Sequence, residues 1–211
     1  MIKAYYQTSK ILKSGKETKA RKRLSRSFLK QFLQILAYGM FSSPNDYIRR
    51  VYGDTNTMTN YSLYPDSGWH YYAIAGEGSL QNNNVYQGYY YYDNASFGIM
   101  IGNDDTPVTS IDYRLGNVIQ HGNSSAKMRY LGMFVDNDIT VSNPNATYSL
   151  ERMFYNNSGL DIVVKELGIY SYSYPPNWGS YIFCQVRDVI SPVTVSTGEY
   201  FKVKYTLQVT V

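Results

Sequence analysis

The sequence predicts a mainly β protein: an antiparallel β-sandwich, jelly-roll-like, preceded by a basic arm and an amphipathic α-helix at the N-terminus. Three observations predict this fold. Short runs rich in β-branched and aromatic residues follow residue 53, separated by clusters of Gly, Asn, Asp and Pro. No helical periodicity lies between these runs, so a parallel sheet with crossover helices is not indicated. Tyr, which favours strands, occurs 24 times.

The N-terminal part, residues 1–44, is expected to differ from the rest of the chain, residues 45–211, which would form the sandwich domain. Residues 1–16 predict an irregular basic arm. From Glu17 onward apolar residues recur about every 3.6 positions, as on one face of a helix, and Gly39 and Pro44 end this pattern. The expected apolar stripe comprises Leu24, Phe28, Leu29, Phe32, Leu33, Ile35, Leu36 and Met40.

The predicted helix has three possible partners. Its apolar stripe could pack on its own β-domain or on a sister subunit, which is the usual fate of an amphipathic helix. It could instead fill a groove of another protein. The third alternative, a membrane surface, is the least favoured, and we expect no membrane partner.

Charge is distributed unevenly along the chain. Residues 1–30 hold ten of the 20 basic residues and a single acid, Glu17, whereas the remaining residues are net acidic. Such asymmetry suggests an extension that binds an acidic protein surface or, through phosphates alone, nucleic acid; a solvated tail is the alternative. The expected partner-binding residues of this arm are Lys16, Lys19, Arg21, Lys22, Arg23, Leu24, Arg26, Phe28, Phe32 and Leu36.

The β-domain is expected to contain many short strands, and its last strand has the clearest pattern. Apolar residues alternate with polar ones from Phe201 to Val211, as in a strand with one buried face. A one-residue shift of the apolar phase between Val164 and Leu167 suggests a bulge, and residues 156–159 suggest a turn. The expected strands are 60–64, 69–75, 86–92, 96–101, 126–135, 147–155, 161–172, 180–189, 193–195 and 199–211.

Motifs that carry chemistry are not evident in the sequence. The two histidines, His70 and His121, have no further ligand at metal-binding spacing, and the acids at 103–105 and 136–138 are interpreted as turn residues. The single cysteine, Cys184, lies in an apolar run and is expected in the core. We therefore expect no enzyme, no metal and no cofactor.

Exposed aromatic residues offer one alternative function. A β-sandwich can present Tyr and Trp to a glycan or to a receptor, since these rings combine an apolar body with a polar tip. The residues that could form such a site, or an interface, are Trp69, Tyr89, Tyr90, Tyr91, Tyr92 and Trp178.

The second half of the chain carries a family resemblance. It includes the run 98–102, then Thr106-Pro107-Val108 and Asp112-Tyr113-Arg114-Leu115, followed by the segments 154–159, 164–170, 187–190 and 192–195. This succession of glycines, turns and strands, over about residues 96–211, resembles capsid, neck or tail-associated structural proteins of tailed bacterial or archaeal viruses.

The resemblance implies a virion component, made in the host cytoplasm, that assembles as a homo-oligomer. It also implies contacts with other virion proteins such as capsid, portal or tail subunits. The first twenty residues contain no apolar segment of the kind found in secretory signals, which agrees with that expectation.

Overall fold

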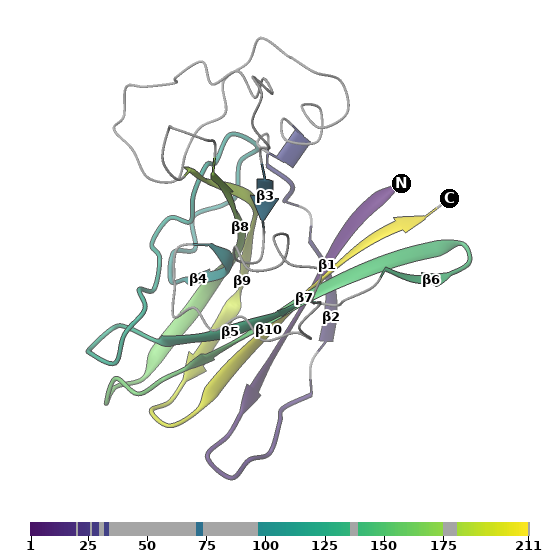
Figure 1. Cartoon of the computed structure of the whole chain (residues 1–211). Coiled ribbons are helices and arrows are strands. Elements are labelled where there is room, and N and C mark those ends of the chain that lie inside the picture. The colour runs from purple at the N-terminus through teal and green to yellow at the C-terminus, as the bar shows by residue number, and fades with distance from the viewer. Residues whose placement is uncertain are drawn as a thin grey trace, which may run out of the picture.

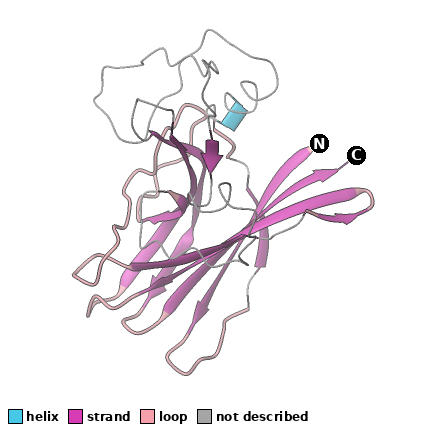
Figure 2. Cartoon of the chain, viewed as in Figure 1, coloured by secondary structure: helices cyan, strands magenta, loops and turns pink. Residues whose placement is uncertain are grey.

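The computed structural model describes residues 1–19, 21–25, 27–29, 32–33, 71–73, 97–135, 139–174 and 181–210. Within these residues the protein is mainly β, and all strand pairs are antiparallel, as the sequence predicts (Figures 1 and 2). The strands are β1 (Ile2–Ile11), β2 (Arg21–Ser25), β3 (Tyr71–Ala73), β4 (Gly98–Gly102), β5 (Arg129–Val135), β6 (Thr140–Ser142), β7 (Asn145–Tyr155), β8 (Ile162–Tyr174), β9 (Tyr181–Val195) and β10 (Tyr200–Thr210).

The larger sheet brings the two ends of the chain together. Its order among the described strands is β2-β1-β10-β7-β5, and β6 pairs with the part of β7 that precedes the β5 pairing. The first strand therefore lies beside the last one, and the amino group of Met1 donates a 2.6 Å hydrogen bond to the carbonyl oxygen of Thr210. The buried face predicted for the last strand is confirmed from Phe201 to Tyr205, since Phe201, Val203 and Tyr205 are buried, but Val209 on the same face is exposed.

The smaller sheet is built around β8. This strand pairs on one side with β9 and on the other with β4 and β3, in succession along its length. The expected bulge is confirmed by a register shift between Val164 and Glu166. The segments predicted as 180–189 and 193–195 are one strand, β9, because Pro192 falls where the register with β8 is interrupted and no ladder donor is needed.

Side chains of both sheets form a single apolar cluster. Phe154 and Tyr205 contribute from the larger sheet, and Ile101 and Leu167 from the smaller one. Arg152 of β7 adds a polar link, since its guanidinium donates to the carbonyl oxygens of Phe97 and Ile99 at 2.9 and 3.2 Å. The two sheets are thus joined by apolar packing and by hydrogen bonds.

The prediction for the N-terminal residues is wrong for residues 2–11 and 21–25, whereas residues 32–33, within the predicted helix, are helical (Figure 2). Residues 2–11 are not an irregular arm but a strand, paired with β10 from Ile2↔Val209 to Ile11↔Tyr200. Residues 21–25 are not helical but form the edge strand β2. Lysines and tyrosines interrupt the apolar alternation of β1, and the spacing of Leu24 and Phe28 fits a helix as well as an extended chain, so long-range pairing decides.

Residues 27–29 continue from β2 to the smaller sheet. Phe28 forms a bridge with Val186 of β9, and the backbone amide of Leu29 donates to Gln185 at 2.9 Å. Leu29 is fully buried in the core. The N-terminal segment therefore contacts both sheets, whereas the predicted helical residues 34–44 lie outside the described part of the chain.

A substitution at Ala4 tests whether residues 2–11 belong to the core. We expect Ala4→Asp to lower the free energy of unfolding by about 3 kcal/mol or more, because a buried position would receive an unpaired charge. Gln7→Asp is the matched control; its side chain lies on the opposite face of β1, and we expect a change within about 0.5 kcal/mol. Urea unfolding measures both changes. Equal effects of the two substitutions would indicate that residues 2–11 form a solvated arm and not a strand of the core.

Candidate interaction surface

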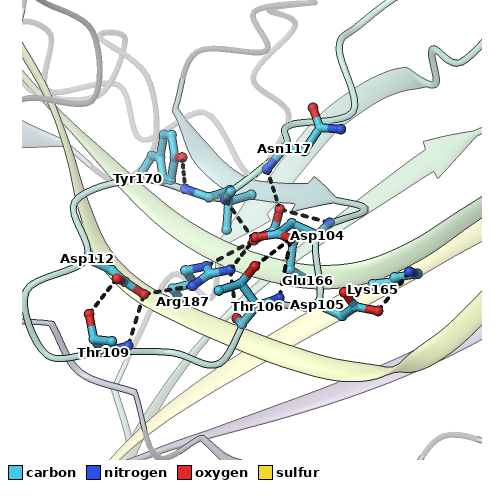
Figure 3. A network of polar contacts seen from close by, with 12 residues as sticks. Asp104, Asp105, Thr106, Thr109, Asp112, Asn117, Lys165, Glu166, Tyr170 and Arg187 are labelled. Atoms are coloured by element: carbon cyan, nitrogen blue, oxygen red, sulfur yellow. Dashed lines mark hydrogen bonds and ion pairs between the residues drawn. The ribbon is translucent and has the colours of Figure 1, made fainter.

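Among the described residues, the most densely connected charged cluster surrounds Arg187 of β9 (Figure 3). The Nε atom donates to Glu166 at 3.0 Å, one terminal nitrogen donates to Asp112 at 2.7 Å, and the other donates to Asp104 at 3.1 Å. The second terminal nitrogen also donates to the carbonyl oxygen of Thr106 at 3.1 Å. The side chain of Arg187 is only 4% exposed and that of Glu166 is fully buried, so solvent screens this cluster weakly.

Glu166 fastens both ends of the loop that follows β4. Its carboxylate accepts hydrogen bonds from the backbone amides of Gly116 and Asn117, at 3.0 and 2.9 Å, and from that of Asp104 at 3.4 Å. A Cβ atom at position 116 would collide with the Asp104 carboxylate, so the approach requires glycine. The hydroxyl of Tyr170 accepts a further bond of 2.7 Å from the amide of Leu115.

The electrostatics of this cluster favour a structural clamp. Burial alone would lower the pKa of Arg187, but the surrounding carboxylates outweigh it and raise the pKa. Burial alone would raise the pKa of Asp112, but hydrogen bonds from Thr109 and Arg187 hold it below its ordinary value. The charged groups thus stabilise one another, and the arrangement fixes the loop of residues 103–117 to β8 and β9.

Cys184 has the core role that its sequence context predicts. The residue is fully buried on β9, and its thiol donates to the carbonyl oxygen of Val186 at 3.4 Å. Burial raises the pKa of the thiol well above its ordinary value. The thiolate is the reactive form of cysteine, and burial disfavours this form of Cys184.

A second candidate site is an apolar surface at the end of the larger sheet, beyond the residues that pack in the core. Residues directly opposite one another on antiparallel strands point to the same face of the sheet. The register pairs Ile2 with Val209, Val209 with Ala146, and Ala146 with Val141. These four residues, one from each of β1, β10, β7 and β6, form a continuous row across the sheet, which we call the apolar row.

The apolar row lies on the face of the larger sheet that carries the core. Val209 has the same parity along β10 as Phe201, Val203 and Tyr205, which are buried. Exposure nevertheless reaches 46% at Val209, 46% at Ile2 and 76% at Val141. Figure 1 shows that the chain ends and the β6–β7 hairpin project together to one side of the view, beyond β4, β8 and β9.

The opposite face of the same strands is polar. Lys3 pairs with Gln208, Gln208 with Thr147, and Thr147 with Thr140, which gives a polar row directly behind the apolar one. The side chains of Gln208 and Thr210 both donate to the Asn145 side-chain oxygen, at 2.6 and 2.8 Å. Hydrogen bonds therefore stabilise the polar face of this projecting part of the sheet. Its other face is apolar, which is typical of a sheet face that is buried.

The residues predicted to bind partners are only partly brought together. Lys16, Lys19 and the β2 residues Arg21, Lys22 and Arg23 are exposed on the turn and strand at one edge of the larger sheet. Leu24 is 43% exposed on β2, whereas Phe28 is packed against the core and its ring centroid lies 4.3 Å from that of Phe32. Leu24, on an exposed edge strand, therefore does not share a stripe with Phe28, whereas Phe28 and Phe32 contact each other.

Several predicted site residues lie outside the described part of the chain. They are Arg26, Leu36, Trp69, Tyr89, Tyr90, Tyr91, Tyr92 and Trp178. The sequence did not single out the residues of the apolar row, although the alternation of the last strand pointed to the face that Val209 occupies. The sequence does not show at which residue of this strand the smaller sheet stops covering the larger sheet.

Comparisons with family models, curated proteins and solved structures give no match to this chain. Among the described residues, no helix is long and apolar enough to cross a membrane. The part of the chain that the structure describes also holds no group of three His, Cys, Asp or Glu residues placed to bind a metal ion.

Replacing Glu166 tests the clamp. We expect Glu166→Gln to lower the free energy of unfolding by about 3 kcal/mol, because the buried Arg187 loses a charge partner and the new amide nitrogen cannot accept a hydrogen bond. Asp105→Asn is the control, since it makes the same chemical change in the exposed Lys165–Asp105 pair and is expected to have little effect. Urea unfolding of both variants measures the difference; equal effects would contradict the clamp.

The pH dependence of stability gives a second test of the cluster. Because the pKa of Asp112 is lowered by folding, its contribution to stability is present above the ordinary value of 3.8 and is lost as the pH falls through the lower folded value. We expect the stability difference between wild type and Asp112→Asn, measured by urea unfolding at a series of pH values, to shrink as the pH falls below 3.8. A difference that stays constant down to about pH 2 would show that Asp112 does not titrate as described.

Proposed function

We propose that this protein is a structural protein that acts in multiple copies, as a component of a virion capsid, neck or tail. The observation that carries the multi-copy role is the apolar row, an ordered apolar strip on the core-facing side of a sheet that is left open to solvent. Contiguous exposed apolar patches are typical of protein interaction sites. The virion assignment rests on the resemblance of residues 96–211 to virion structural proteins.

The proposed fold is an antiparallel β-sandwich of jelly-roll type. Support comes from the single core cluster to which both sheets contribute, with Phe154 and Phe201 on one side and Ile101 and Ile169 on the other. Sheets that share one core in this manner form the two layers of a sandwich. A fold of this kind suits repeated assembly because it presents long sheet faces and edges to its neighbours.

The basic edge of the larger sheet is proposed as a second contact surface. Arg21, Lys22 and Arg23 are exposed on β2, and the Nζ atom of Lys22 lies 4.1 Å from the centroid of the Tyr5 ring. Cations held on an edge strand suit acidic partners, which for a virion component are acidic faces of neighbouring subunits or packaged nucleic acid. We assign to this surface the partner binding that the sequence predicted for a basic helical arm.

Composition agrees with an assembly protein. Charged residues make up only 17% of the chain, while aromatic residues make up 16%. Interfaces favour large aromatic side chains, and a surface with few charges resists close contact less than a highly charged one. The same composition also suits a sheet-rich fold, so it supports the proposal without deciding it.

The native mass of the full chain tests the proposed function. We expect the purified protein to form regular assemblies whose mass is a whole multiple of the 24.2 kDa chain, visible as uniform rings or particles by electron microscopy. Native mass spectrometry measures the number of copies. A protein that remains at the single-chain mass at every accessible concentration would contradict a multi-copy role.

A further inference from the structure

We propose that the basic edge of the larger sheet, with the turn that leads into it, binds double-stranded nucleic acid through its phosphates and without reading its sequence. The inference rests on the second contact surface of the proposed function and commits that surface to one class of partner. It does not depend on the multi-copy role. The cations that carry it are Lys16, Lys19, Arg21, Lys22 and Arg23.

The first argument is that the fold does not use the charge of this edge. Among the described residues, none of the five cations forms an ion pair. The one acid nearby in the chain, Glu17, is already bound, since its carboxylate accepts a 2.6 Å hydrogen bond from Ser9 and lies 2.7 Å from Nζ of Lys202. Lys10 pairs with Glu199 at 3.1 Å. The excess positive charge therefore faces solvent, where it attracts a polyanion.

The second argument is that the fold holds these cations in place. Backbone hydrogen bonds close the turn before β2: the amide of Leu12 donates to the carbonyl oxygen of Lys16 at 3.0 Å, and the amide of Thr18 donates to that of Lys10 at 2.8 Å. β2 pairs with β1 along all five of its residues. Cations on such a framework lose less conformational entropy on binding than cations on a flexible tail.

The third argument is the arrangement of the charges, which favours a duplex over an acidic protein surface. Successive residues of a strand point to opposite faces of the sheet. Arg23 pairs with the buried Tyr6 and so lies on the face that carries the core, as Arg21 does. Lys22 pairs with Gln7 on the outer face, and all three cations are exposed. An acidic protein surface would meet one of these faces, whereas a groove of a duplex has phosphates along both sides.

The fourth argument is the composition of the edge. The exposed side chains of β2 are the three cations and Leu24. Protein–nucleic acid interfaces are much more positively charged than protein–protein interfaces, whose cores are apolar and poor in Lys. Proteins that bind single strands stack bases on aromatic rings, but the Tyr5 ring beside β2 is covered on one face by Nζ of Lys22, at 4.1 Å from its centroid. The edge therefore suits the phosphates of a duplex.

Two arginines of β2 provide the test. We expect Arg21→Gln combined with Arg23→Gln to weaken binding of a short labelled DNA duplex at least about tenfold. The variant should also reduce the slope of log affinity against log salt concentration by about 2, since each phosphate contact contributes about 1. Fluorescence anisotropy of the full chain at a series of salt concentrations measures both quantities.

A matched control removes the same charge elsewhere. Lys127→Gln combined with Arg129→Gln changes cations at and just before β5, at the other end of the larger sheet from β2, and should have little effect on affinity or slope. Lys16→Gln combined with Lys19→Gln, in the turn, should act like the β2 variant while leaving β2 itself unaltered. An equal loss in the control variant would show that binding reflects net charge alone and would overturn the inference.

Competing ligands identify the partner. Two DNA duplexes of unrelated sequence should bind equally, whereas the single strand and polyglutamate should bind at least about tenfold more weakly. Polyglutamate bound as tightly as the duplex would assign the edge to acidic proteins, and a single strand bound as tightly would assign it to unpaired nucleic acid. No binding of the duplex would leave these cations the role of preventing edge-to-edge pairing of sheets. Each of these three results would overturn the inference.

The outcomes separate this inference from the multi-copy role. A chain that forms assemblies but leaves the duplex unbound would overturn the inference and leave the multi-copy role intact. A chain that binds the duplex and remains at the single-chain mass would contradict the multi-copy role alone. Unchanged thermal unfolding of the β2 variant confirms that the fold is preserved.

Discussion

The structure depends on a mismatch of length between its two sheets. β7 and β10 pair along eleven residues, from Tyr200↔Tyr155 to Thr210↔Asn145, but only part of that length faces the smaller sheet. Alternation in a strand does not stop where its cover ends, because successive side chains point to opposite faces over the whole strand. The uncovered end therefore retains an apolar face, and the apolar row, on which the proposed multi-copy role rests, follows from this constraint.

Ion pairs and hydrogen bonds, more than apolar packing, hold the loop that follows β4. The loop of residues 103–117 contributes Leu115 to the core but is otherwise mostly polar and exposed. Arg187 and Glu166 hold it by hydrogen bonds to Asp104, Asp112 and backbone amides. Such a clamp is specific in geometry, since each donor of the guanidinium has one direction, and it fixes where the loop lies on the smaller sheet.

The sequence predicted those features of the fold that depend on residues close together in the chain. The buried face from Phe201 to Tyr205, the bulge near Val164 and the buried Cys184 are confirmed. The turn at 156–159 is confirmed as well, with Gly159 at a positive φ of 84° and the Asn156 side chain accepting a bond from the Ser158 amide. These features depend on residues close together in sequence, so the chain itself displays them.

Features that depend on distant pairing could not be predicted in this way. Residues 2–11 were expected to be irregular because their strand character is decided by β10, at the other end of the chain. β6 was missed because it has only three residues. The Arg187 cluster joins residues up to 83 positions apart, so no motif reveals it. The same holds for the apolar row, whose members come from four strands and are unremarkable when each is taken alone.

The exposure of Val141 in the native assembly tests most directly whether the uncovered end of the larger sheet is an interaction surface. In a single chain this side chain is 76% exposed. A side-chain-resolution structure of the native assembly should show it largely buried by another chain. Val141 left as exposed in the assembly as in the single chain would contradict the proposed interaction surface.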